Sequence, residues 1–90
     1  MVKAKILCIE DDSDMIDYLK LILGKAGYEV LGALGGREGL EKMRSEQPDL
    51  ILLDLMMPVL DGADVLLQKK KDPTIDDIPV IALTALDSPF

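Results

Sequence analysis

Histidine is absent from this 90-residue sequence, and aromatic residues make up only 3% of it. The first absence removes imidazole from every catalytic scheme. The second leaves the core to Leu, Ile, Val, Met and Ala. Cys8 is the sole cysteine, so no internal disulfide can form. Its place inside an apolar run predicts a small buried core residue rather than a reactive thiol.

Basic residues are outnumbered by acidic ones, ten against seventeen, which gives a net charge of −7. This balance argues against a nucleic-acid surface, which needs clustered Lys and Arg, and leaves no polybasic patch for a membrane. The only basic run, Lys69 to Lys71, ends a predicted helix, where we expect it to stay solvated and complement the helix dipole. No apolar segment reaches the roughly 18 residues of a membrane span, and the N-terminus lacks a signal-peptide pattern. We therefore expect a cytoplasmic protein.

Short apolar runs alternate with amphipathic patterns along the chain. The runs predict strands over 5–9, 28–34, 50–53 and 78–84, and the amphipathic patterns predict helices over about 13–26, 37–46 and 62–71. In the last helix we expect Val65 and Leu66 to be buried. Such alternation predicts right-handed βαβ units and a parallel sheet, which is the α/β class. A chain of this length allows one domain, so we expect residues 1–90 to form a single unit.

Carboxylates follow two of the predicted strands. The apolar run Leu50 to Leu53 leads directly into Asp54, and the first strand is followed by Glu10, Asp11 and Asp12. Alone, Asp54 is better explained as a cap of the following loop, and Asp12 can equally cap the next helix. If the two strands are parallel neighbours, however, their ends gather three or four negative charges. That adjacency requires the strand order 2-1-3-4, with the switch point beneath the site.

A carboxylate cluster of this kind is costly without a counter-ion, because like charges so close raise one another's pKa or require a cation. Hard oxygen ligands select Mg²⁺, which proteins usually hold with one or two carboxylates, waters and a phosphate. A lone aspartate beside a bound Mg²⁺ can attack phosphorus and form an acyl phosphate. The hypothesis is therefore phosphoryl transfer onto Asp54.

Three segments carry a family resemblance: Lys5 through Asp12, Asp54 to Pro58 with Asp61 and Gly62, and Pro79 to Ala85. Together, over nearly the whole chain, they resemble the response regulator receiver domain of two-component signalling. The resemblance implies a three-layer flavodoxin-like fold. A receiver of this family continues with a helix, a fifth strand that ends in a phosphate-binding lysine, and a further helix. We therefore expect a C-terminally truncated receiver that lacks this last helix-strand-helix.

The resemblance also implies a role for individual residues. Asp54 matches the phosphoacceptor, which takes a phosphoryl group from a sensor histidine kinase, a phosphotransfer protein or a small phosphodonor. Asp11 matches a direct Mg²⁺ ligand, and Asp54 is expected to share in binding the metal. Glu10 matches a ligand that acts through water, and the main-chain carbonyl of Met56 a third protein ligand. Thr84 matches the switch hydroxyl that bonds a phosphoryl oxygen. The implied protein is a signalling switch and not a turnover enzyme.

Two alternatives stay open. The missing lysine favours a phosphorylation-independent interaction or dimerisation module. The segment Ile78 to Ala85 carries apolar residues on both faces and would form an unprotected edge strand. We therefore expect either self-association, by edge pairing or exchange of elements, or a piece cut from a longer chain. The other alternative is a phosphatase of the haloacid-dehalogenase type, which also uses a strand-end aspartate. Such enzymes need a second acid two residues further on, where this chain has Met56.

Overall fold

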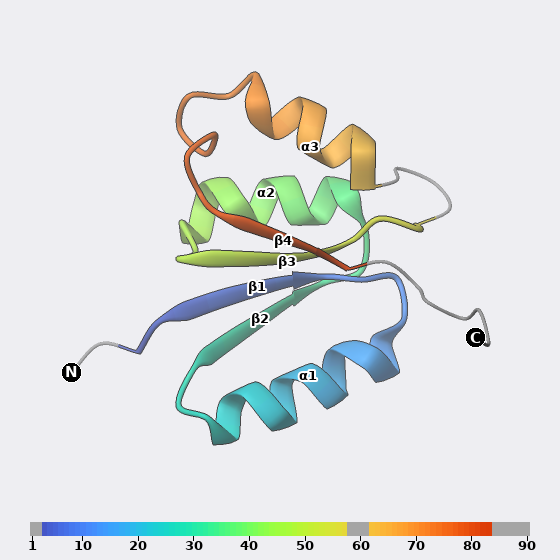
Figure 1. The fold of residues 1–90 in the computed structure, drawn as a ribbon, viewed down its shortest axis with the longest axis vertical. Coiled ribbons are helices and arrows are strands. Elements are labelled where there is room, and N and C mark those ends of the chain that lie inside the picture. Colours follow the sequence, from blue (N-terminus) through green and yellow to red (C-terminus); the bar gives the residue numbers. More distant parts are fainter. Residues whose placement is uncertain (1–2, 58–61, 84–90) are drawn as a thin grey trace.

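The computed structural model describes residues 3–57 and 62–83. Its elements follow one another as β1 (Lys5–Ile9), α1 (Ser13–Lys25), β2 (Glu29–Ala33), α2 (Gly36–Glu46), β3 (Leu50–Asp54), α3 (Gly62–Lys70) and β4 (Val80–Leu83). The four strands form one parallel sheet in the order β2-β1-β3-β4. Helix α1 covers one face of this sheet and helices α2 and α3 cover the other, which makes three layers (Figure 1). The predicted α/β class and strand order are confirmed.

The main core lies between the sheet and helices α2 and α3. Strands β1 and β3 are apolar on both faces because both faces of the sheet are covered, as is usual for parallel sheets. The residues of the buried cluster are Leu7, Ile9, Ala33, Leu40, Met43, Ile51, Leu53, Met57, Val65, Ile75 and Ile78. No helix in the described part of the chain combines the length and the hydropathy that crossing a membrane requires.

The loop that follows α3 is tied to two helices. Arg44 of α2 donates a hydrogen bond from Nε to Oδ2 of Asp72 at 2.7 Å, and Thr74 donates to Oδ1 of the same carboxylate from its hydroxyl. These hydrogen bonds lower the pKa of Asp72 to about 2, and the bond from Arg44 has the largest effect. Lys69 of α3 donates from Nζ to the carbonyl of Asp76 at 2.8 Å. These bonds fix the path by which the chain enters β4.

Two predictions about α3 were wrong. Lys69 is buried rather than solvated, because the loop after α3 folds back and supplies a carbonyl acceptor for its ammonium group. Leu66 was expected in the core but is 37% exposed. Val65 and Lys69 are four residues apart and share the inward face of the helix, whereas Leu66 lies about 100° further around it.

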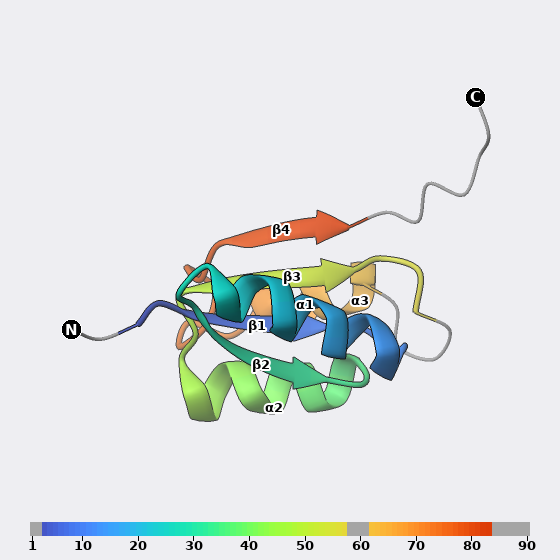
Figure 2. The ribbon, with the colours of Figure 1, turned by 90° about the horizontal axis from the view of Figure 1, so that it is seen from below.

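The α1 side of the sheet is covered less completely. Ile16 is the one buried residue of α1, and Ile81 on β4 is 51% exposed. Strand β4 lies at the edge of the sheet, beyond β3 (Figure 2), and no strand pairs with its outer side within residues 3–57 and 62–83. Thr84, expected to end this strand, lies outside the described residues. Self-association through the edge stays a prediction.

Gly39 allows α2 to lie close to β1. A Cβ atom added at Gly39 would lie 2.5 Å from Cδ1 and 2.8 Å from Cγ1 of Ile9. The side chain of Ile9 is 1% exposed and sits in the core, so it has little room to move aside. The close packing of helix on strand therefore depends on the missing side chain.

We predict that Gly39→Ala lowers the free energy of unfolding by about 1–3 kcal/mol, because the new methyl group overpacks the core. Gly24 in α1 is the matched control, since a Cβ atom there meets nothing within 4 Å. Gly24→Ala should raise the free energy of unfolding by about 0.4–1 kcal/mol. Urea unfolding followed by circular dichroism measures both, and the same sign for the two variants would contradict the close approach at Gly39.

Candidate functional site

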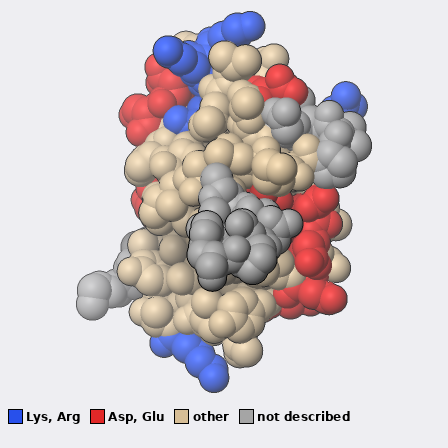
Figure 3. Space-filling model, turned by 45° about the vertical axis from the view of Figure 1, so that its right-hand side comes forward, with Lys and Arg blue, Asp and Glu red and all other residues tan. Residues whose placement is uncertain are grey.

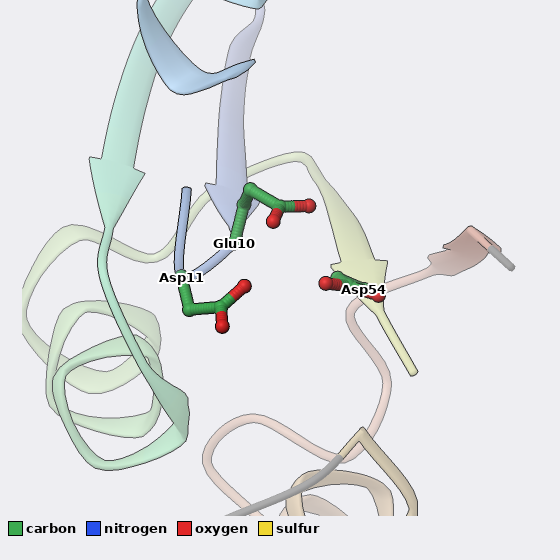
Figure 4. A group of neighbouring side chains, drawn as sticks. All are labelled: Glu10, Asp11 and Asp54. Carbon is green, nitrogen blue, oxygen red and sulfur yellow. The ribbon is translucent and has the colours of Figure 1, made fainter. Parts of the chain in front are cut away.

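Three carboxylates converge at the carboxyl edge of the sheet, between β1 and β3. The strand register pairs Ile9 with Leu53, so Glu10 and Asp54 follow at neighbouring strand ends. One oxygen from each of Glu10, Asp11 and Asp54 lies within 4.8 Å of the other two. Figure 4 shows the three side chains directed into a common space from the two strand ends. The structure thus brings together three of the side chains that the sequence singled out.

Asp54 is the most firmly held of the three. Its side chain is buried, and its Oδ1 accepts a hydrogen bond from the backbone N–H of Met56 at 2.9 Å. Its main chain is paired within the sheet, where Asp54 aligns with Leu83. The next residue, Leu55, donates from its backbone N–H to the carbonyl of Leu83 at 3.1 Å. Asp54 therefore sits in a fixed position with its carboxylate oriented by the turn that follows it.

The electrostatics of the site are those of crowded negative groups. Partial burial, together with the Asp11 and Asp54 carboxyls, raises the pKa of Glu10 to about 7. The backbone N–H of Asp12, which donates to Oε1 of Glu10 at 3.2 Å, acts in the opposite direction. The ion pairs Lys5–Glu46, Lys42–Glu38 and Arg44–Asp72 involve none of the three carboxylates of the site. The cluster thus holds excess negative charge.

The donor set fits a hard divalent cation. All three side chains offer carboxylate oxygen, which is the ligand type that Mg²⁺ prefers. The neighbouring strand residue Cys8 is buried, and burial raises the pKa of its thiol to about 11, so no thiolate competes as a donor. Met56 shares the turn with Asp54 and is 68% exposed. Its thioether sulfur is a soft ligand, whereas its main-chain carbonyl offers the oxygen that a hard cation takes.

Asp12 is adjacent in sequence but has another role. Its Oδ1 accepts a hydrogen bond from the backbone N–H of Asp14 at 2.9 Å, and it is the N-cap of α1. The capping explanation offered by the sequence is confirmed for this residue. Thr84, expected to supply a hydroxyl at the same edge, lies outside the described residues.

Gly62 is a residue near the site that the sequence analysis did not single out for a role. A Cβ atom at Gly62 would lie 2.6 Å from Cα of Leu55 and 2.9 Å from the carbonyl oxygen of Asp54. In the sequence it stands in one of the segments that carry the family resemblance and is the first residue of a predicted helix, with no role of its own. The signal available in the sequence was the residue type. Glycine is a poor helix former, so a glycine in a helix often marks a place where another part of the chain lies close to the helix backbone.

Acidic side chains dominate part of the surface. In Figure 3 they gather along the right-hand margin and at the upper left, whereas Lys and Arg lie mostly at the top and bottom of the view. The whole chain has a net charge of −7. This distribution suits attraction of a cation to the molecule.

Known proteins share both the sequence pattern and the fold. The family model of the response regulator receiver domain matches residues 6–90. The chain is 40% identical over 86 residues to the alkaline phosphatase synthesis transcriptional regulatory protein PhoP of Bacillus subtilis (strain 168), a match that covers 96% of this chain and 35% of that protein. It thus spans about a third of the length of the curated relatives it matches.

Among solved structures, the chemotaxis protein CheY4 of Vibrio cholerae superposes with a TM-score of 0.88 at 32% identity, over 98% of this chain and 73% of that one. The phosphorylated cyanobacterial phytochrome response regulator RcpA superposes with a TM-score of 0.82 at 34% identity, over 97% of this chain and 69% of that one. With its three-layer fold, its 2-1-3-4 sheet and these matches, the chain belongs to the response regulator receiver domain family of two-component systems.

Proposed function

We propose that residues 1–90 act as one phospho-accepting switch in the cytoplasm, with Asp54 phosphorylated in a Mg²⁺-dependent transfer. The observation that carries this proposal is the convergence of three carboxylates around a buried strand-end aspartate. Family membership supports it, and so does the solved structure of a phosphorylated relative, RcpA. The phosphoryl donor is a sensor histidine kinase or a phosphotransfer protein, each of which presents a phosphohistidine.

In this proposal the Asp54 carboxylate is the nucleophile. It attacks phosphorus, the bond from phosphorus to the imidazole nitrogen breaks with its electron pair staying on the ring, and an acyl phosphate forms on Asp54. The N–H of Met56, bonded to Oδ1, orients the carboxylate for this attack. Because one chain accepts one phosphoryl group, the protein is a switch rather than a turnover enzyme.

The remaining residues prepare the charge environment. Asp11 and Asp54 would hold Mg²⁺ directly through their carboxylates. Glu10 would act through a water molecule, and the main-chain carbonyl of Met56 would be the third direct protein ligand. When bound, the ion supplies the positive charge that offsets the carboxylates and the phosphoryl oxygens. Thr84 supplies a hydroxyl that bonds the phosphoryl group. A hydroxyl engaged only in the phosphorylated state provides the differential contact that a switch requires.

A second candidate function is an interaction module that self-associates through β4. The observation that favours it is the exposure of two apolar residues on this edge strand, Ile81 at 51% and Leu83 at 36%. The proposed partner is a second copy of the chain, because the unpaired backbone groups of an exposed apolar edge strand can pair with the same strand of another molecule.

We predict that incubation with acetyl phosphate and Mg²⁺ adds one phosphoryl group to the chain, detected by intact mass spectrometry. Asp54→Asn should abolish the modification, and a chelator should prevent it. Asp77→Asn is the matched control, since Asp77 is an exposed aspartate in the loop before β4, and it should be modified like the wild type. An unmodified wild-type chain that still binds Mg²⁺ would count against the switch.

We predict that Asp11→Asn weakens Mg²⁺ binding by about tenfold or more, because loss of even an outer-shell partner typically costs that much. Titration of the backbone amide signals by NMR measures the dissociation constant. Asp12→Asn is the control, since asparagine caps a helix as well as aspartate does and Asp12 is used as a cap. Equal weakening in both variants would argue that only net charge matters.

We predict that the wild-type chain sediments as a dimer at micromolar concentration and that Ile81→Lys shifts it to the monomer, since lysine on an edge strand blocks edge pairing. Leu67→Lys serves as the comparison, because Leu67 is 57% exposed but lies on α3. It should leave the dimer intact. A monomeric wild-type chain would refute the self-association.

A further inference from the structure

We infer that Gly62 is a positioning residue for the Asp54 site: its missing side chain lets the first turn of α3 pack directly on the backbone that carries Asp54 and Met56. This inference rests on the proposed function, because it concerns the geometry of the same metal and phosphoryl site. Gly62 itself does not touch the reacting atoms, so its effect acts through the turn that follows β3.

Two of the three atoms nearest to a Cβ atom at Gly62 belong to the main chain. A Cβ atom there would lie 2.6 Å from Cα of Leu55, 2.6 Å from its Cδ2, and 2.9 Å from the carbonyl oxygen of Asp54. At Gly32 and Gly39 the closest neighbours are instead side-chain atoms, of Ile16 and Ile9. A side chain can change rotamer to make room, but a strand-end backbone can do so only by shifting the whole turn.

Space, and not backbone conformation, is what requires glycine at this position. Among the described glycines, Gly27 is the one with a positive φ, so the φ of Gly62 is one that other residues adopt readily. A glycine that opens a helix without a special conformation gives up helix propensity relative to alanine. The compensating gain at Gly62 is the close approach of α3 to the site.

The backbone that Gly62 contacts is the one that orients the site. Leu55 lies between Asp54 and Met56, and its N–H is bonded to Leu83 of β4 at 3.1 Å. The Met56 N–H is bonded to Oδ1 of Asp54 at 2.9 Å. The turn is therefore clamped between β4 on one side and Gly62 on the other. A well-formed metal site holds its distances to within about 0.2 Å, so a small shift of this turn changes metal affinity.

The test compares Gly62→Ala with wild type by NMR titration with Mg²⁺ alone, and measures the free energy of unfolding in urea. We expect Mg²⁺ binding about tenfold weaker, or more, as for other changes that misplace ligands. Gly32→Ala is the matched control, since its Cβ atom would overlap Cγ2 of Ile16 at 2.6 Å on the α1 side of β2. It should lower stability and leave the Mg²⁺ dissociation constant unchanged.

Unchanged Mg²⁺ binding in a folded Gly62→Ala variant would overturn the inference, and so would equal weakening in Gly32→Ala, which would mean general loosening. A wild-type chain that binds no Mg²⁺ would instead refute the proposed function. If Gly62→Ala does not fold by circular dichroism, the double variant Gly24→Ala/Gly62→Ala replaces it, because Gly24→Ala is expected to raise the free energy of unfolding. Mg²⁺ binding about tenfold weaker than in Gly24→Ala supports the inference. Binding equal to that of Gly24→Ala overturns it.

Discussion

Parallel pairing of β1 with β3 is the constraint on which the site depends. The two strands are separated in sequence by α1, β2 and α2, yet they align from Ile6 with Leu50 to Ile9 with Leu53. A slip of one residue would turn the alternating side chains to the opposite faces of the sheet, so the buried core on both faces enforces the register. Apolar packing, and not any attraction between the acids, brings Asp54 beside Glu10 and Asp11.

The core therefore holds together groups that repel one another. The elevated pKa of Glu10, about 7, reflects partial burial and its proximity to Asp11 and Asp54. Under the proposed function, a bound divalent cation relieves this repulsion in the folded chain only, since the unfolded chain does not gather the three carboxylates. Ligands that bind only the folded state stabilise it by mass action, so metal occupancy and folding stability would rise together.

The adjacency of β1 and β3 could be predicted from the sequence because two apolar runs both end in acids, and only neighbouring parallel strands place those ends side by side. Features that depend on how a loop folds back were less accessible. Lys69 is buried because its ammonium group donates a hydrogen bond to the carbonyl of Asp76. The spacing of apolar residues along the helix does not indicate such a bond. Leu66 is exposed because Val65 and Lys69, and not Leu66, lie on the inward face of α3. Gly62 matters through its distance to Leu55. A glycine at the start of a helix can indicate a close approach, but the sequence does not indicate which atoms lie against it.

The two candidate functions share a structural link. Asp54 and Leu55 are joined to β4 through register with Leu83 and through the bond from Leu55 N–H to the Leu83 carbonyl. A phosphoryl group on Asp54 would add negative charge within one residue of that bond. If the turn after β3 shifted in response, β4 would shift with it, because the bond joins the two. Because β4 also carries the exposed Ile81, association through this edge and phosphoryl acceptance would be coupled. Thermodynamic linkage makes such coupling reciprocal, so pairing of β4 would in turn change the stability of the phosphorylated site.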